Sequence, residues 1–459
     1  MIKRYYATKD NTITNAYAEN LTTRGSDANM GASDILEVFS IYGQTQDTLG
    51  AFSTEEARVL IQFDVSQLQA DITDGSLDST ATFYLRLFNA PHGKTLPLNF
   101  EIEVVPLEEA WQEGTGMDME GYTDLTYGNG SSWNEAGASA NWTTSGGHFP
   151  AGTPVSKTFD EGTEDLLIDV TSFVSTWLLT PETNFGLIVK LPTTATAETR
   201  SYYTKMFFAR STSNFFKKPT LEARWDSQVK DQRNSFYSTK QNTVYLYNEF
   251  RGSLVDLTDP VTVSFYESLG GIALGPSPVT ATEVTQGIYK ADVTLTTSSG
   301  TIYDVWSAAG TEVHSGSISI IQPSMASESS ISDLVVSVLN NQDSHYSNQT
   351  SRFYFYIREK NWSPNIHTVA TTRPPSKVYD KLVYKISRVV TDEVVFDYDF
   401  ENSSTTLSYD ANGNFFDLDI AMLEVNYVYE IKLALFNVMT KSYQELPFKH
   451  RFRVVNNEH

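Results

Sequence analysis

The sequence predicts an all-β protein of several domains, and three observations support this. Aromatic residues make up 13% of the chain, with 25 Tyr and 26 Phe, and such residues suit pleated, half-buried surfaces. Charged residues make up only 19%, whereas exposed helix faces are usually filled with Lys and Glu. Short apolar–polar alternations recur, and long helical periods are absent. We expect a larger N-terminal jelly-roll or β-sandwich followed by two smaller immunoglobulin-like β-sandwiches.

The length of 459 residues suits about three domains. Strand-like patterns stop at two polar segments, which we interpret as linkers. The first domain then covers 1–226, a linker covers 227–241, the second domain covers 242–322, a Ser-rich linker covers 323–330, and the third domain covers 331–459.

The first domain carries strand-like segments and one helix. Several segments alternate apolar and polar residues, as half-buried strands do. The strand candidates are 57–63, 81–88, 101–105, 166–170, 186–191, 205–209 and 220–225. A short helix is predicted over 171–179, capped by Thr171 or Ser172. Its apolar face would carry Phe173, Val174 and Trp177.

The second and third domains continue the strand pattern. The candidates are 243–247, 261–266, 287–293, 301–306, 334–339, 352–357, 381–386, 393–398, 427–435 and 448–455. Asn412-Gly413 between two of them predicts a hairpin. Asn426-Tyr427, just before the longest candidate, predicts a tyrosine corner of the immunoglobulin-like kind.

Charge and cysteine content exclude several classes of protein. The net charge of −23 repels nucleic acid backbones and acidic membranes, so we expect neither as a partner. The absence of cysteine excludes disulfides and Cys-ligated metal sites, and it favours folding in a reducing cytoplasm. The first residues, 1–6, are not followed by the apolar run of a secretion signal. We therefore expect assembly in a cytoplasm.

The sequence shows no pattern typical of an enzyme. The seven histidines are scattered, and no metalloprotease, serine-hydrolase or Walker motif occurs. Glu108, Glu109 and Glu113 flank Trp111, which leaves glycoside hydrolysis open as a minor alternative. The segment 410–419 offers oxygen ligands for Ca²⁺ but lacks the full loop spacing, and a tight turn is the stronger prediction. We expect no catalytic residue, no cofactor and no metal.

A long excursion, 115–150, interrupts the first domain and is rich in Gly, Ser, Asn and Trp. Aromatic side chains there suggest a contact surface for a ligand or a partner protein. The candidate residues are Trp111, Tyr122, Tyr127, Trp133 and Trp142. Three interpretations remain open: the rings pack the excursion onto its own sandwich, they form a protein interface, or they stack on sugars.

Short motifs follow one another in a fixed order through the first domain. They are Asp10-Asn11-Thr12-Ile13, Asn29-Met30-Gly31, the Arg-led stretch 58–66, Trp111-Gln112-Glu113, Asp169-Val170-Thr171 with Trp177, Asn184-Phe185-Gly186-Leu187, and Pro219-Thr220-Leu221-Glu222. In this order the region resembles the DNRLRE-type β-sandwich, a family grouped with carbohydrate-binding modules. The resemblance implies a β-sandwich fold and a binding role.

The whole chain also resembles uncharacterised structural proteins of marine tailed phages, on the segments 1–6, 201–218 and 222–227. That resemblance implies a virion location after assembly in the host cytoplasm. We expect a head decoration, a neck or collar component, or a fibre. Its partners would be other virion proteins, in a homo-oligomer or symmetric array, with contact to a host surface glycan. The alternative is a carbohydrate-binding adhesin or an accessory module of a polysaccharide-degrading system.

Overall fold

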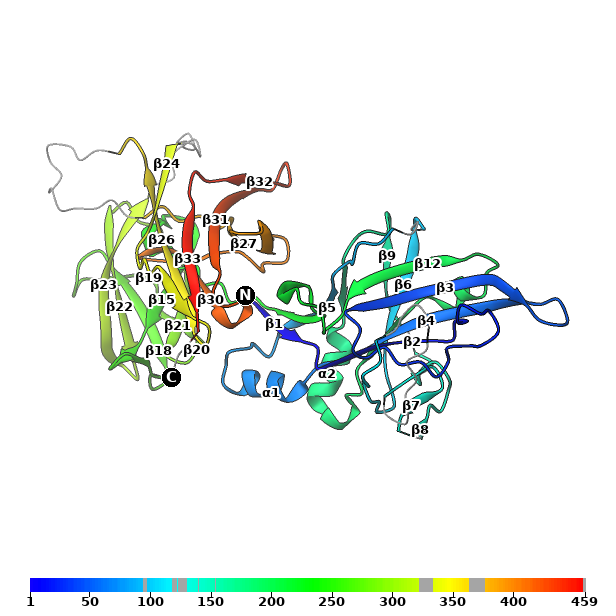
Figure 1. Cartoon of the computed structure of the whole chain (residues 1–459). Coiled ribbons are helices and arrows are strands. Elements are labelled where there is room, and N and C mark those ends of the chain that lie inside the picture. The colour runs from blue at the N-terminus through cyan, green and yellow to red at the C-terminus, as the bar shows by residue number, and fades with distance from the viewer. Residues whose placement is uncertain are drawn as a thin grey trace. The chain divides into compact units, whose positions relative to one another are not determined.

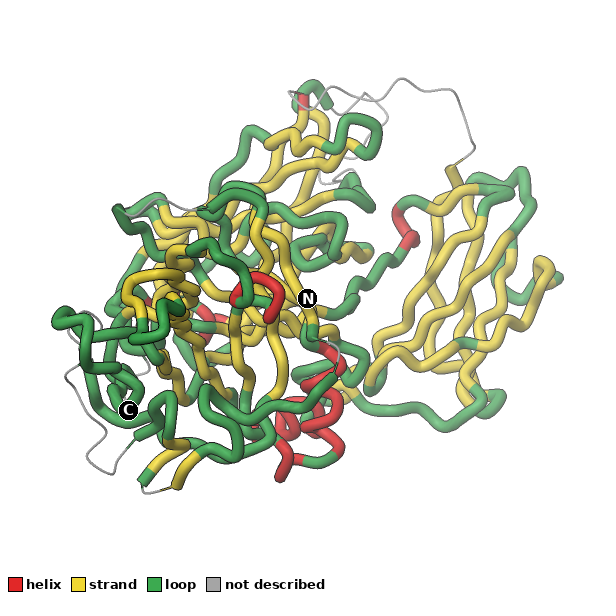
Figure 2. Tube along the Cα trace, turned by 90° about the vertical axis from the view of Figure 1, so that its right-hand side faces the viewer, coloured by secondary structure: helices red, strands yellow, loops and turns green. Residues whose placement is uncertain are grey.

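The computed structural model describes residues 1–93, 97–117, 122, 130–138, 140–152, 154–321, 333–362 and 376–456. Strands dominate these residues, which confirms the all-β prediction (Figure 2). Two compact units are present, Ile2–Trp225 and Asp226–His459. The first unit holds one large sandwich, and the second holds two smaller sandwiches (Figure 1).

The first unit is built from antiparallel strands. They are β1 (Ile2–Tyr6), β2 (Lys9–Thr14), β3 (Ile35–Gln46), β4 (Phe52–Gln62), β5 (Thr82–Leu87), β6 (Phe100–Pro106), β7 (Glu135–Gly137), β8 (Ala140–Asn141), β9 (Val155–Phe159), β10 (Leu166–Asp169), β11 (Leu187–Lys190), β12 (Tyr202–Phe208) and β13 (Thr220–Arg224). One sheet has the order β1-β13-β5-β10, and the other has the order β12-β3-β4-β11-β6-β9 with β2 beside β4. Apolar side chains from both sheets share a core that includes Phe159 and Trp177.

Short helices connect some of these strands. They are α1 (Val65–Thr73), α2 (Thr171–Leu179), α3 (Thr193–Thr196), η1 (Pro181–Thr183) and η2 (Phe215–Lys217). The helix predicted over 171–179 is confirmed, and it buries Val174 and Trp177. Its predicted cap is wrong, because the hydroxyl of Thr171 accepts a hydrogen bond from the backbone N–H of Phe83 instead. Helix α1 was not predicted.

The second sandwich occupies the first part of the second unit. Its strands are β14 (Phe236–Tyr237), β15 (Gln241–Tyr247), β16 (Glu249–Phe250), β17 (Ser253–Leu254), β18 (Val261–Tyr266), β19 (Ala273–Thr280), β20 (Thr282–Thr285), β21 (Ile288–Thr294), β22 (Thr301–Ala308) and β23 (Thr311–Ile321). The sheets β14-β23-β22-β18-β19 and β15-β21-β20 enclose a core around Phe265 and Trp306. This arrangement agrees with the immunoglobulin-like prediction.

The third sandwich follows. Its elements are β24 (Leu334–Val338), β25 (Ser344–Tyr346), β26 (Thr350–Glu359), β27 (Leu382–Arg388), β28 (Glu393–Phe396), β29 (Ser408–Asp410), β30 (Gly413–Asp419), η5 (Ile420–Met422), β31 (Val428–Asn437), β32 (Ser442–Glu445) and β33 (His450–Val455). The sheets are β24-β26-β30-β29 and β25-β33-β31-β27-β28, with β32 beside β31. The buried rings of Phe353, Phe355 and Phe416 lie close together.

The segment 227–241, predicted as a linker, carries defined structure. It contains η3 (Gln232–Asn234) and β14, and Lys230 forms a parallel bridge with Tyr409 of β29. The backbone N–H of Asp231 donates to the carbonyl of Tyr409 at 3.0 Å. This segment therefore forms hydrogen bonds with the third sandwich and also contributes a strand to the second. The other predicted linker, 323–330, lies outside the described residues.

Two local predictions in the third sandwich have different outcomes. The Asn412-Gly413 hairpin is confirmed, because Asp410 pairs with Gly413 and the Asp410 carboxylate accepts the Asn412 N–H at 2.8 Å. The tyrosine corner involves another residue. The hydroxyl of Tyr429, rather than that of Tyr427, donates to the backbone carbonyl of Glu424 at 2.8 Å.

Candidate functional site

The aromatic residues predicted as a contact surface lie mainly inside the first sandwich. Trp111 and Trp142 are 3% and 5% exposed. They belong to an apolar cluster that joins the excursion to one face of the larger sheet, with Ile13, Leu60, Val105, Leu107, Ala136 and Ile188. Their indole N–H groups donate to the carbonyls of Phe185 and Ser132, both at 2.9 Å. Both rings are occupied in packing, which is the first of the three interpretations that the sequence left open.

The remaining candidates differ in exposure. Trp133 is half-buried, and the guanidinium of Arg58 lies 4.7 Å from its ring centre. The same guanidinium donates to the carbonyl of Gly146 at 2.8 Å. Tyr122 is half-buried beside a small apolar cluster on β3 and β4, and Tyr127 lies outside the described residues. Arg58, the first residue of the most specific motif, thus holds the excursion against β4.

Other motif residues also hold the excursion. The amide of Asn29 donates to the carbonyls of Glu113 and Ser131 at 2.8 and 2.7 Å. Gly114 has φ +82°, and a Cβ on this residue would lie 2.3 Å from the Asn29 amide oxygen. The chain can approach Asn29 so closely only because a glycine stands there. The motif residues Arg58 and Asn29 therefore hold the excursion in place, and these contacts occupy their side chains.

A buried carboxyl, Asp10, completes this network. Its carboxylate accepts the backbone N–H of Arg210, whose guanidinium pairs with Glu113 at 2.8 Å. Burial raises the pKa of Asp10 to about 7, although the hydrogen bond from Arg210 opposes that shift. Such a shift is common at functional sites, but the two polar partners of Asp10, Arg210 and Glu113, also pair with each other next to the start of the excursion.

The three carboxylates that left glycoside hydrolysis open are engaged separately. Glu113 pairs with Arg210, Glu108 lies 3.3 Å from the imidazole of His148, and Glu109 accepts the backbone N–H of Thr143 at 3.1 Å. A glycosidase needs two carboxyl groups facing one bond across a cleft. The distinct partners of these residues favour a structural role for each of them.

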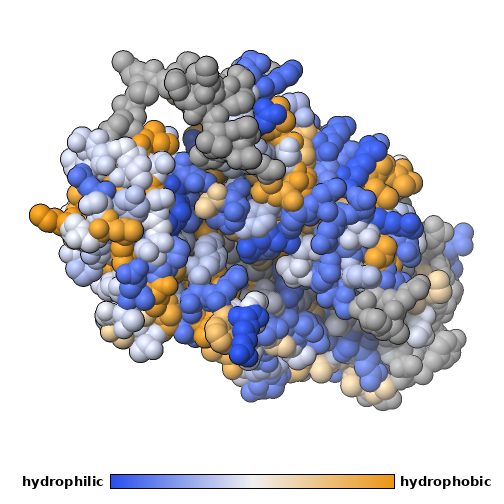
Figure 3. All heavy atoms as spheres, turned by 90° about the vertical axis from the view of Figure 1, so that its left-hand side faces the viewer, coloured by the Kyte–Doolittle hydropathy of each residue, from blue (hydrophilic) through white to orange (hydrophobic). Residues whose placement is uncertain are grey.

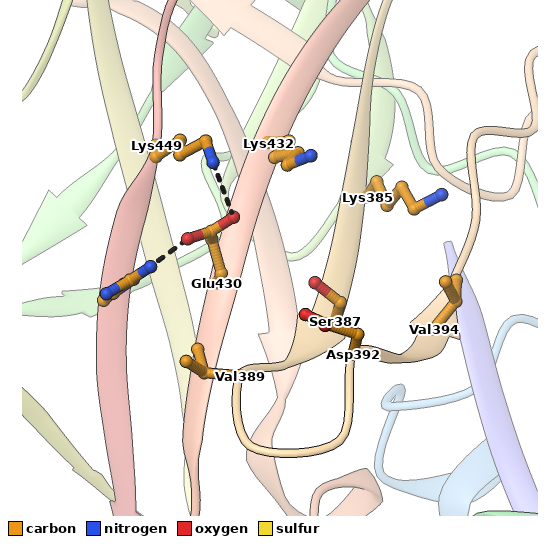
Figure 4. A pocket seen from close by; sticks show the side chains of 9 residues that line it. Lys385, Ser387, Val389, Asp392, Val394, Glu430, Lys432 and Lys449 are labelled. Atoms are coloured by element: carbon orange, nitrogen blue, oxygen red, sulfur yellow. Dashed lines mark hydrogen bonds and ion pairs between the residues drawn. The ribbon is translucent and has the colours of Figure 1, made fainter.

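A polar hollow of about 360 Å³ lies on the third sandwich, and the sequence did not predict it (Figure 4). It is formed mainly on the outward face of the sheet that contains β27, β31 and β33 (Figure 4). Its lining residues are Lys385, Ser387, Val389, Asp392, Val394, Glu430, Lys432, Lys449 and Arg451. The outward positions alternate with buried Ile386, Ile431 and Phe452.

Three lysines cross the hollow in one row. Lys385 and Lys432 are direct partners in the ladder between β27 and β31. Lys449 immediately precedes β33, whose last pair with β31 is Ile431 with His450, so continuing that register places Lys449 opposite Lys432. Figure 4 shows the three side chains on adjacent strands. Each lysine alone resembles an ordinary outward position, and only the strand register brings them together.

Glu430 lies on β31 beside the three lysines. Its carboxylate accepts the Arg451 guanidinium at 2.9 Å and lies 3.6 Å from the Lys449 ammonium (Figure 4). Burial favours a higher pKa for Glu430, but the hydrogen bond from Arg451 and the nearby lysine charges outweigh it and lower the pKa. Glu430 therefore stays ionised and fixes Arg451 at the rim of the lysine row.

No described helix combines the length and apolar character needed to cross a membrane. Within the same part of the chain, no group of three or more His, Asp or Glu side chains is placed to hold a metal ion.

Comparisons with known proteins give only distant likenesses. No protein-family model and no curated protein matches the chain. Solved structures similar to it include the Yersinia pseudotuberculosis adhesin InvE (16% identity, 47% of this chain, 56% of that chain, TM-score 0.16), the titin domains z1z2 in complex with telethonin (12%, 48%, 91%, 0.14) and murine CEACAM1b (8%, 48%, 95%, 0.15). The chain thus spans little more than half of the adhesin, and we base no functional inference on these likenesses.

Proposed function

We propose that this chain is a structural protein of a tailed-phage virion that acts through contacts between the faces of its β-sandwiches and other virion proteins. One observation carries the proposal. The motif residues and most of the described aromatic candidates of the first sandwich are used to fasten its own excursion, so contact with partners falls to the broad outer surfaces. Such surfaces suit docking on a symmetric assembly.

Surface character and composition support the same proposal. The side of the second unit seen in Figure 3 is a mosaic of hydrophilic residues and small hydrophobic patches. Non-obligate protein interfaces have about the same apolar content as ordinary surface, so this mosaic suits docking. The lack of cysteine suits assembly in a host cytoplasm. The resemblance of three segments of the chain to phage structural proteins points the same way.

Mass spectrometry of purified particles tests the proposal. Particles would be banded by density from a lysate of cells that carry the gene, and peptides of the chain would be quantified against the major capsid protein. We expect a constant ratio across the particle band, with peptides from both units. An abundant cytoplasmic host protein serves as the contamination control. A chain that stays in the soluble fraction, with no enrichment over that control, would remove the virion assignment.

A second candidate function, a carbohydrate-binding adhesin or accessory module, is favoured by the polar hollow on the third sandwich. A glycan array with the purified chain tests this candidate: a chain that binds no glycan on it loses the adhesin role, and a chain that binds a glycan but is absent from particles has the adhesin role in place of the virion role.

A further inference from the structure

The row of Lys385, Lys432 and Lys449 is unusual because it places like charges side by side across neighbouring strands of a sheet. Like charges directly opposite each other on neighbouring strands destabilise the pair, and Lys385 faces Lys432 in this way. The chain carries 56 acidic and 33 basic residues, so an acidic side chain was the commoner choice at such a position. A repulsive row in an acidic protein indicates that these ammonium groups have a role other than stability.

The existing partners of the row leave it open to a ligand. Lys385 pairs with Asp397 at 3.0 Å and Lys432 pairs with Glu445 at 3.7 Å; the lysine side chains are 23% and 26% exposed, and their carboxylate partners are 65% and 50% exposed. Exposed ion pairs contribute little to stability, so an incoming anion can replace them at small cost. Glu430 is different, because it is 9% exposed and bonded to Arg451.

The size of the hollow selects a small ligand. Its volume of about 360 Å³ falls within the range of roughly 300–1,000 Å³ found for ligand pockets. Adjacent strands lie about 4.8 Å apart, so three lysines span about 10 Å. The hydroxyl of Ser387 and the carboxylate of Asp392 face the same space and suit the hydroxyl groups of a sugar.

We propose that the hollow on the third sandwich binds an acidic saccharide, a sugar unit that carries a carboxylate or sulfate group. The row of Lys385, Lys432 and Lys449 contacts the anionic group, and Ser387 and Asp392 bond to sugar hydroxyls. This inference rests on the glycan contact expected of the proposed virion protein, and it names the class of glycan. Carboxylate and sulfate meet lysine by the same charge attraction, so the experiment uses one source of each.

Calorimetric titration of the full chain tests the inference. The probes are tetragalacturonate with its fully methyl-esterified form, and a sulfated carrageenan tetrasaccharide with its desulfated form. We expect binding of at least one acidic probe, weakened by salt, and roughly tenfold weaker binding of its uncharged counterpart. Lys432→Gln should weaken that binding by roughly tenfold as well, while Lys157→Gln on exposed β9 should leave it unchanged.

Thermal melting of the same variants shows whether the row is merely structural. Removing the repulsion at Lys432 should leave the Tm unchanged or raise it by roughly 1–2 °C, so Lys432→Gln stays folded and its loss of binding is interpretable. A clear drop in Tm would show that Lys432 stabilises the sheet, against the inference.

Four results would overturn the assignment. They are no binding of either acidic probe, equal binding of the uncharged forms, unchanged binding by Lys432→Gln, and equal affinity for inorganic sulfate, which would mark a simple anion site. The particle measurement is independent of the hollow. A chain found in particles that binds no acidic saccharide refutes only this inference, and a saccharide-binding chain absent from particles refutes only the virion role.

Discussion

Glu222, on β13, is a fully buried carboxylate that lies among three guanidinium groups. It accepts hydrogen bonds from Arg4 at 3.0 Å, Arg86 at 3.3 Å and Arg224 at 2.6 Å. Burial alone would raise its pKa, but the three arginines outweigh burial and lower the pKa to about 2. One carboxylate thus pairs with guanidinium groups on three strands of the smaller sheet, β1, β5 and β13.

Replacing this carboxylate should destabilise the first sandwich strongly. Glu222→Gln keeps the shape but removes the carboxylate shared by Arg4, Arg86 and Arg224, of which Arg4 and Arg224 are buried, and we expect a loss of about 3–5 kcal/mol in the free energy of unfolding near neutral pH. Because the folded pKa is depressed, the stabilisation by Glu222 is present above the ordinary carboxyl pKa and disappears as the pH falls toward 2. Urea unfolding from neutral to acidic pH measures it. Glu101→Gln, at the exposed position of the otherwise largely buried β6, is the control, and a loss equal to the control's would contradict the prediction.

Asp10 should show the opposite pH dependence. Its pKa is raised to about 7 by burial, so folding takes up a proton and the contribution of the protonated form is lost as the pH rises from about 4 to 7. Asp10→Asn removes this titration while its amide oxygen can still accept the Arg210 N–H. The free energy of unfolding of the variant, relative to the natural chain, should rise by on the order of 1–3 kcal/mol across that pH range. A difference that stays constant with pH would show that Asp10 titrates normally.

At the scale of the elements, the excursion of the first sandwich carries one tryptophan that is buried and one that is half-buried. Trp142 is buried in the cluster over the sheet, whereas Trp133 is half-buried beside Arg58. Trp142→Ala should therefore cost about 3–5 kcal/mol of stability. Trp133→Ala removes a half-buried ring that packs against the same cluster, together with its cation–π contact, and should cost about 1–2 kcal/mol. Denaturant unfolding of the two variants measures this difference. Equal losses would mean that Trp133 is as firmly packed as Trp142.

The sequence predicted the elements better than the site. Alternating residues mark β5 and β18 clearly, because each has one buried face. The sequence did not predict helix α1, because the stretch 58–66 resembles one continuous strand. In the structure, Asp64 caps the helix by accepting the backbone N–H of Ser66 at 2.9 Å. The lysine row could not be predicted, since the pairing of Lys385 with Lys432 depends on register between strands distant in the chain.

At the scale of the whole chain, a unit that folds cooperatively can contain more than one sandwich. The second and third sandwiches belong to one compact unit, and the segment before the second sandwich bonds to β29 of the third. Backbone N–H groups of Asp231 and Tyr409 donate to the carbonyls of Tyr409 and Val229 at 3.0 and 2.8 Å, and the Asn234 amide donates to the carbonyl of Ala411 at 2.6 Å. A cut between these two sandwiches removes such bonds, whereas a cut at 225/226 leaves them intact.

Three fragments of the chain test this difference. Fragments 1–225 and 226–459 should each fold, and their melting transitions should reproduce those of the full chain. Fragment 226–321 should be less stable than the same sandwich within 226–459, because it loses at least three hydrogen bonds worth about 0.5–1.5 kcal/mol each. Differential scanning calorimetry measures all three. An unchanged Tm for fragment 226–321 would show that the second sandwich is stable by itself and gains no stability from the bonds between the segment 227–241 and β29.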